Sequence, residues 1–348
     1  MLGGGVKLAG KPWRRIRWAV LGAVALLGLT GCGIVTAPES TFNPAGPVAR
    51  LQLSDIVVSA LIMTGIFIIV AGILVVAIIR FRARKGHERD IPPQIEGNTT
   101  LELIWTIVPF MIIAFLGVLT VSGSFTLGEQ PPTNQALVVK VTGHQFWWAF
   151  QYPSQNITTA NDLHIPVGKK IDLEMTSADV MHAFWVPRLG GKQDLIPGRT
   201  TYMWFEASRP GIYTGQCAEF CGTGHAYMRI IVDAQPKAQF AKWVQQMTHP
   251  VSTPTSPLAK EGEHYFMTVG CSACHTIAGT NAFGIIGPNL TDLTARPKIA
   301  GNSFANTPAN LARWIANPPK MKPGALMPKL PLTHHEITAI VAYLEDLR

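Results

Sequence analysis

Four of the five cysteines lie in two short segments, and each segment also contains a histidine. The first, Cys217-Ala-Glu-Phe-Cys221-Gly-Thr-Gly-His225-Ala-Tyr-Met228, holds two thiols, an imidazole and a thioether within twelve residues, and His182 lies 35 residues upstream. Sulfur and imidazole ligands together favour copper or zinc, and a thioether favours copper. A mononuclear blue-copper site needs only one cysteine, so the second thiol allows both sulfurs to bridge two copper ions. A disulfide is the alternative, but it gives His182 and Met228 no role.

The second segment, Cys271-Ser-Ala-Cys274-His275, has the C-x-x-C-H spacing of covalent haem attachment. In such a site two cysteine thioethers hold the porphyrin, and the following histidine is an axial iron ligand. A redox-active dithiol is the alternative. It is disfavoured by the adjoining histidine and by the helix that the sequence predicts over Lys260–Val269, directly before the motif.

Two long uncharged runs precede these segments. Ile56–Ile79 has 24 residues and Leu103–Leu127 has 25, and about 20 apolar residues are enough to cross a bilayer. A core helix of a soluble domain is the alternative for each run, but such helices rarely extend so far without a charge. Together with 47% apolar and only 14% charged residues, the runs predict a membrane protein with two spans.

The N-terminus is typical of a targeting segment. Basic residues precede a short apolar core, Ala19–Leu29, and Leu29-Thr-Gly-Cys32 resembles a bacterial lipoprotein signal. Cleavage before Cys32 would leave a lipidated cysteine. A third transmembrane helix or a plain signal anchor is the alternative, although the apolar core is short for a span.

The charge distribution predicts membrane topology rather than a nucleic-acid partner. The net charge is +8, but ten basic residues lie before the N-terminal apolar core or in the loop Arg80–Arg89. The part from 129 to 247 has 10 basic and 9 acidic residues and therefore no strong electrostatic field. This near balance of charge disfavours nucleic-acid binding. By the positive-inside rule the basic loop is cytoplasmic. Everything after about residue 128 is then predicted on the outer side.

Composition divides the outer part into two domains. A Pro/Ser/Thr-rich linker over 249–258 separates residues 129–248 from 259–348. In the first domain, four runs predict the strands of a β-sandwich or barrel, and these runs are Ala136–Val141, Lys170–Met175, Thr200–Phe205 and Met228–Val232. The second domain ends in a capping box, Thr333-His-His-Glu336, before a helical apolar pattern. The remaining boundaries are a signal peptide at 1–31, a tether at 32–50 and the transmembrane hairpin at 51–128.

The segment from 217 to 228 resembles the dinuclear Cu-A motif of subunit II of the haem-copper cytochrome c oxidases, C-x-E-x-C-x-x-x-H-x-x-M. The stretch Asp179-Val-Met-His182-Ala-Phe-Trp-Val-Pro187 and the tripeptide Pro197-Gly-Arg199 match further parts of that family. The resemblance implies a cupredoxin-like domain in which both cysteines bridge two copper ions. The other copper ligands that it implies are His182, His225, Met228 and the carbonyl of Glu219, whose carboxylate would bind a magnesium ion shared with subunit I.

Two further segments resemble the same family. Glu102-Leu-Ile-Trp-Thr-Ile-Val-Pro109 looks like the start of its second helix, where a glutamate serves the entrance of a proton path; a solvated residue at a helix start is the alternative. Gly143-His-Gln-Phe146-Trp147-Trp148 matches its electron-transfer aromatic patch, with phenylalanine where many members have tryptophan. Packing beneath the copper loop is the alternative for these rings.

The C-terminal part resembles class I cytochrome c in Gly287-Pro-Asn-Leu290 and Leu326-Met327-Pro328. This resemblance implies an all-α domain with His275 and Met327 as the axial haem ligands, and Met327 is preferred to Met321 because it precedes proline as in the family. The histidines at 87, 144, 164, 249, 264, 334 and 335 have no metal spacing and are expected to be surface or packing residues.

The resemblances together imply a multidomain subunit II of a respiratory terminal oxidase with a fused cytochrome c, in a bacterial plasma membrane. Its implied partners are subunits I and III, an electron donor and lipid. A lipid-anchored electron carrier without an attached enzyme is one alternative, but it does not explain Glu102, Glu219 or two spans. A nitric-oxide-reducing complex is another. A quinol-oxidising subunit is disfavoured because it would lack the copper ligands, and all six are present.

Overall fold

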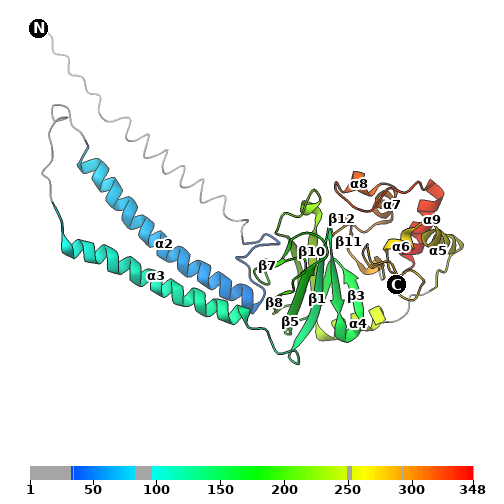
Figure 1. Cartoon of the computed structure of the whole chain (residues 1–348), viewed down its shortest axis with the longest axis horizontal. Helices are drawn as coiled ribbons and strands as arrows, with labels where there is room; N and C mark the ends of the chain where they lie inside the picture. The colour runs from blue at the N-terminus through cyan, green and yellow to red at the C-terminus, as the bar shows by residue number, and fades with distance from the viewer. Residues whose placement is uncertain (1–32, 34, 83–95, 249–252, 292, 348) are drawn as a thin grey trace, which may run out of the picture.

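The structure is a computed structural model of the chain, and it describes residues 33, 35–82, 96–248, 253–291 and 293–347. The predicted signal peptide, the lipidation candidate Cys32, most of the basic loop and residues 249–252 of the linker lie outside the described residues. Within the described part, a helical hairpin, a β-domain and a small helical domain follow one another along the chain (Figure 1).

Two long helices form the hairpin. Helix α2 covers Pro47–Arg80 and helix α3 covers Thr99–Gly128, with mean hydropathies of 3.0 and 2.4 in their most apolar windows. They lie side by side, and the start of α2 and the end of α3 adjoin the β-domain (Figure 1). Neither apolar window is buried within the chain, so both helices present apolar side chains to their surroundings. This confirms the two predicted spans and fits a membrane protein.

Helix α2 begins at Pro47 and not at residue 51, so the predicted end of the tether is part of the helix. Proline suits the first helical position because the missing N–H would have no partner there. The residues around it are buried against the β-domain: the Ala45 amide donates to the Arg188 carbonyl over 2.7 Å, and the Ser208 amide donates to the Ala45 carbonyl over 2.8 Å. The chain before α2 is therefore fastened to the β-domain.

The β-domain is a sandwich of two five-stranded sheets with the orders β3-β2-β1-β5-β8 and β4-β10-β9-β6-β7. All four predicted strands are confirmed, with slightly different ends. The other six strands were not predicted. The strands are β1 Ala136–His144, β2 Trp147–Tyr152, β3 Ile157–Ala160, β4 Asp162–Pro166, β5 Lys170–Ser177, β6 His182–Trp185, β7 Lys192–Leu195, β8 Thr201–Phe205, β9 Gly211–Cys217 and β10 Arg229–Gln235, with 3-10 turns η1 at Pro153–Gln155 and η2 at His225–Tyr227.

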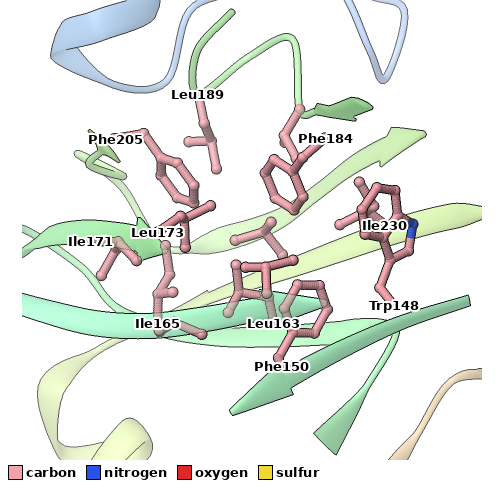
Figure 2. Packing of buried hydrophobic residues seen from close by; sticks show 14 of the residues in the cluster. Trp148, Phe150, Leu163, Ile165, Ile171, Leu173, Phe184, Leu189, Phe205 and Ile230 are labelled. Carbon is pink, nitrogen blue, oxygen red and sulfur yellow. The ribbon is translucent and has the colours of Figure 1, made fainter. Parts of the chain in front are cut away.

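Aromatic and branched side chains from both sheets meet in the centre of the sandwich. Figure 2 shows Trp148, Phe150 and Phe184 together with branched aliphatic residues in this core. A helix that the sequence analysis did not predict, α4 at Lys237–Thr248, closes one end through buried Trp243 and Met247. The few apolar residues of α4 lie on one side of the helix, and packing of that side against the sandwich stabilises the helix.

The C-terminal domain is mainly helical around a separate apolar core that includes Phe266, Leu311 and Ile340. The predicted helix before the haem motif is confirmed but starts earlier, at Pro257, with Ser256 as its N-cap. The predicted capping box at Thr333 and Glu336 is also present. The elements are α5 Pro257–Thr268, α6 Cys271–Cys274, η3 Leu293–Ala295, β11 Lys298–Ile299, β12 Phe304–Ala305, α7 Pro308–Ala316, α8 Pro318–Met321 and α9 His334–Glu345.

Candidate copper and haem sites

The predicted copper ligands converge at one end of the sandwich. The Cys217 and Cys221 Sγ atoms are 3.9 Å apart, and both residues are free thiols rather than a disulfide. His182 Nδ1 lies 3.9 Å from Cys217 Sγ, while His225 Nδ1 lies 3.6 Å and Met228 Sδ 3.9 Å from Cys221 Sγ. The arrangement puts two sulfurs at the centre with an imidazole on each side, as a bridged metal pair requires.

Three different segments supply these groups. Strand β9 ends in Cys217, strand β6 begins with His182, and the turn between β9 and β10 carries the remaining three side chains. The Cys217 amide donates to the Met228 carbonyl over 2.9 Å, which closes the base of this turn. Two neighbouring strands and the closed turn therefore position the sulfur and imidazole groups.

The Glu219 carbonyl also faces the cluster, because Cys217 Sγ lies 3.2 Å from its oxygen. A carbonyl in this place can serve as a further weak ligand. The side chain of Glu219 is half-buried and is not part of the group formed by His182, Cys217 and Cys221.

The two neighbouring thiols affect each other's pKa. Their contact, opposed by burial, lowers the pKa of Cys217 to about 4, with His182 and backbone groups adding to the effect. The same contact raises the pKa of Cys221. The contact therefore favours the thiolate form of Cys217 and the neutral form of Cys221.

Asp179 orients His182, and the sequence analysis did not identify it. Its Oδ1 accepts a hydrogen bond from His182 Nε2 over 2.8 Å, and its Oδ2 accepts one from the Gln145 amide over 2.6 Å. Since Nε2 then carries the proton, the Nδ1 lone pair points to the sulfurs. Carboxylates commonly fix metal-binding histidines in this way. The D-x-x-H spacing was the available signal.

A cavity of about 380 Å³ lies in the C-terminal domain and reaches the copper domain. Its lining is mostly apolar and includes Cys271, Cys274, His275 and Met327. These are the two predicted attachment residues and the two predicted axial ligands. A cavity of this size and polarity, with two thiols, an imidazole and a thioether in its wall, suits a covalently attached haem.

His275 is held in one orientation. Its Nδ1 lies 2.8 Å from the Pro288 carbonyl oxygen, to which it donates, so Nε2 remains free to bind iron. Burial lowers the pKa of His275, which keeps the imidazole neutral as ligation requires. A Cβ at Gly287 would lie 2.6 Å from His275 Cε1, so the predicted Gly287-Pro288 pair is needed for this close packing.

The two candidate methionines differ in position. Met327 lines the cavity, whereas Met321 ends α8 and is not among the described lining residues. We expect Met327→Ala to lower the haem reduction potential, because a methionine ligand raises it. Met321→Ala, the matched control, should leave the potential unchanged. Redox titration of the haem measures both; a lower potential only in Met321→Ala would contradict the assignment.

Comparison with known proteins identifies three parts of the chain. Residues 43–122 match the cytochrome c oxidase subunit II transmembrane domain, residues 154–235 its periplasmic domain, and residues 259–348 cytochrome c. The chain is 37% identical over 327 residues to a cytochrome c oxidase subunit 2 of Alkalihalophilus pseudofirmus, covering 92% of this chain and 94% of that protein. This chain belongs to the cytochrome c oxidase subunit II family. It therefore works with subunit I in a haem-copper oxidase, and its domains imply copper and haem.

Two other matches cover less of this subunit II. A quinol oxidase subunit 2 of Bacillus cereus is 38% identical over 225 residues, which is 64% of this chain and 76% of that protein. The crystal structure of the periplasmic domain of cytochrome oxidase subunit II from Bradyrhizobium japonicum is 35% identical, covers 34% of this chain and 96% of that one, and has a TM-score of 0.33.

The three predicted electron-transfer aromatics occupy different places in this subunit II. Phe146 and Trp147 line the haem cavity, and Trp147 stacks on His144 with ring centroids 4.2 Å apart. Trp148 is fully buried in the sandwich core beside His182, as packing would require. The position of His144 on the cavity wall was not predicted, because no metal spacing marks it.

Glu102 lies in the first turn of α3, whose N-cap Asn98 accepts a hydrogen bond from the Leu101 amide over 3.1 Å. An acid in the first turn of a helix suits its dipole, and this geometry alone gives Glu102 no further role. His164 stacks on Trp243 with ring centroids 4.4 Å apart, and His335 Nε2 lies 2.9 Å from a Glu261 carboxylate oxygen. His87 and His249 lie outside the described residues.

Proposed function

We propose that this subunit takes electrons into a covalent haem c, passes them to a dinuclear Cu-A centre and delivers them to subunit I, where oxygen is reduced to water with proton translocation. The haem is attached at Cys271 and Cys274, with His275 and Met327 as axial ligands. The copper ligands are the side chains of His182, Cys217, Cys221, His225 and Met228 and the carbonyl of Glu219.

A single observation supports this electron path: the haem cavity and the copper cluster share a wall. Copper-domain residues including Phe146 and Asp179 line the same cavity as Cys271, Cys274 and His275. Asp179 is also hydrogen-bonded to His182, one of the copper ligands. The Asp179 carboxylate and the His182 imidazole therefore connect the haem cavity with the copper cluster.

The haem and the copper pair supply one-electron redox chemistry when they are bound. The protein holds their ligands in place: Asp179 sets the tautomer of His182, and the Pro288 carbonyl sets that of His275. The buried thiols exclude water from the sulfur cluster. Ligands that are positioned in this way need little rearrangement when the charge of the metals changes.

The remaining assignments concern the membrane and the partners. The two spans cross a bacterial plasma membrane with the copper and haem domains outside, and Cys32 carries a lipid. Glu219 binds magnesium together with subunit I, and Glu102 lies at the entrance of a proton path. Subunit III and an upstream cytochrome or reductase complex complete the assembly. The +8 net charge, carried mostly by the N-terminus and the basic loop, supports this orientation.

The proposal predicts two copper ions per chain. Because both thiols can bridge, the oxidised pair should share one unpaired electron. Metal analysis of the purified complex measures the number of copper ions per chain, and electron spin resonance shows whether two ions share the unpaired electron. A single copper ion with a four-line hyperfine pattern would show that the site is mononuclear and would refute the proposal.

A further inference from the structure

The cytochrome c domain is fastened to the copper domain by the loop between β11 and β12. Asn302 in this loop is 2% exposed, and its Nδ2 donates to the Asn161 carbonyl and to Asp162 Oδ1, each over 2.9 Å. Asn302 has a φ of 61°, a left-handed conformation that asparagine tolerates. One amide group thus makes two buried hydrogen bonds across the domain boundary.

The same loop also contacts the turn that carries the copper ligands. The Gly301 carbonyl accepts a hydrogen bond from the Arg229 amide over 3.1 Å, and Ser303 Oγ donates to the Tyr227 carbonyl over 3.1 Å. Both partners adjoin Met228. The loop therefore binds next to a candidate copper ligand and not at a remote part of the sandwich.

Lys322 makes a second connection close to the haem cavity. The residue is only 4% exposed, and its Nζ donates to the Phe146 carbonyl over 2.8 Å and to the Ala300 carbonyl over 3.1 Å. A buried ammonium is costly unless it is hydrogen-bonded, so these carbonyls compensate for its burial. One carbonyl belongs to each domain, and Phe146 is itself part of the cavity wall.

Glycine allows the two backbones to come this close. A Cβ at Gly301 would lie 2.6 Å from the Tyr227 carbonyl oxygen and 2.9 Å from that of Phe146. Gly301 also has a φ of 72°, which a larger residue adopts only with strain. The boundary thus combines buried hydrogen bonds with a shape that only glycine permits, which is typical of a specific interface.

We propose that Lys322 and Asn302 are positioning residues that hold the haem cavity against Phe146, so that haem and copper exchange electrons across a fixed interface. The inference rests on the proposed function and adds the docked geometry to it. The transfer moves one electron from the haem to the copper pair and needs no other reactant. A flexible tether alone would give the haem domain a high effective concentration near the copper domain. Each electron transfer would then still wait until the haem domain had diffused into a productive orientation.

The test compares three variants of the full complex with the parent. Lys322→Met keeps the length of the side chain and removes the donor, and Asn302→Gly keeps the left-handed backbone and removes the amide. Lys320→Met is the matched control, because Lys320 is exposed and lies two residues earlier on the same segment. Haem and copper contents are verified in each variant before any rate is compared.

Two readouts report on docking. Hydrogen exchange of a peptide that contains the Arg229 amide measures opening of the interface directly. We expect it to accelerate about tenfold in Lys322→Met and Asn302→Gly, and not in Lys320→Met. Flash-induced electron transfer from haem to copper should slow and become dependent on solvent viscosity in the first two variants only.

The proposal would be overturned if both Lys322→Met and Asn302→Gly kept the parental rate of hydrogen exchange. Their electron transfer from haem to copper would also have to keep the parental rate and stay independent of viscosity. If one variant fails to assemble, the other decides the question by the same readouts. Failure of the proposed function is a different result: the parent complex would then lack copper or haem, or would show no transfer from haem to copper at all.

Discussion

An assembled oxidase without its haem attachment site is expected to oxidise an external cytochrome roughly 100-fold more slowly than the parent at micromolar donor. The variant is Cys271→Ala combined with Cys274→Ala. A tethered haem has a millimolar effective concentration at the copper domain, and the variant replaces it with a donor that must diffuse. The surface around Phe146 also contacts the cytochrome c domain, so it is poorly placed to receive a free protein.

Steady-state oxygen consumption with soluble cytochrome c measures this effect. Copper and the haems of subunit I must be intact in the variant. Ser272→Ala is the matched control, because it changes one of the two residues between the cysteines and leaves both thiols in place. If the double variant is as fast as the parent, with the same salt dependence, the haem domain is not the obligatory entrance for electrons.

Loss of either bridging thiol is expected to abolish the shared copper site. Replacement of a residue that only orients a ligand typically costs 10–100-fold in metal affinity, so removal of a bridging sulfur should cost more than about 100-fold. Cys217→Ser and Cys221→Ser should therefore lose copper from the purified complex, together with the signal of a shared electron. The haem should remain, because its ligands belong to another domain.

Met228→Leu is the matched variant for this prediction. It removes a weak ligand from the same fully buried place while keeping the apolar volume. Copper should be retained, and its reduction potential should change, which a redox titration measures. Retention of two copper ions in Cys217→Ser would contradict the bridging assignment, since a serine oxygen is a poor ligand for such a pair.

The chemistry of this chain could be predicted from its sequence because the informative residues lie close together along the chain. Cys217, Cys221, His225 and Met228 lie within twelve residues, and Cys271, Cys274 and His275 lie within five. The two spans were equally predictable, since a bilayer demands a long uncharged run whatever the rest of the protein does. Strand β1 was found for the same reason, because its run of apolar and β-branched residues is a local feature of the sequence.

Residues whose role depends on distant partners could not be predicted in this way. The sequence analysis did not single out Lys322. It is buried, and its Nζ donates a hydrogen bond to the Phe146 carbonyl, 176 positions away in the chain. Asp179 lies close to His182 in sequence, but only the fold places its carboxylate between that imidazole and the haem cavity. Helix α4 and the early start of α2 likewise depend on the sandwich against which they pack.

The sequence by itself determined which groups are candidates to bind copper and haem and which segments are long and apolar enough to cross a membrane, because local spacing and composition decide both. Only the tertiary structure decided how the two redox sites face each other. That arrangement depends on the fit between Gly301 and the carbonyls of Phe146 and Tyr227, and on buried hydrogen bonds from Lys322 and Asn302. Such contacts join residues far apart in the chain, and their free energy arises only when the domains meet and water leaves the boundary between them.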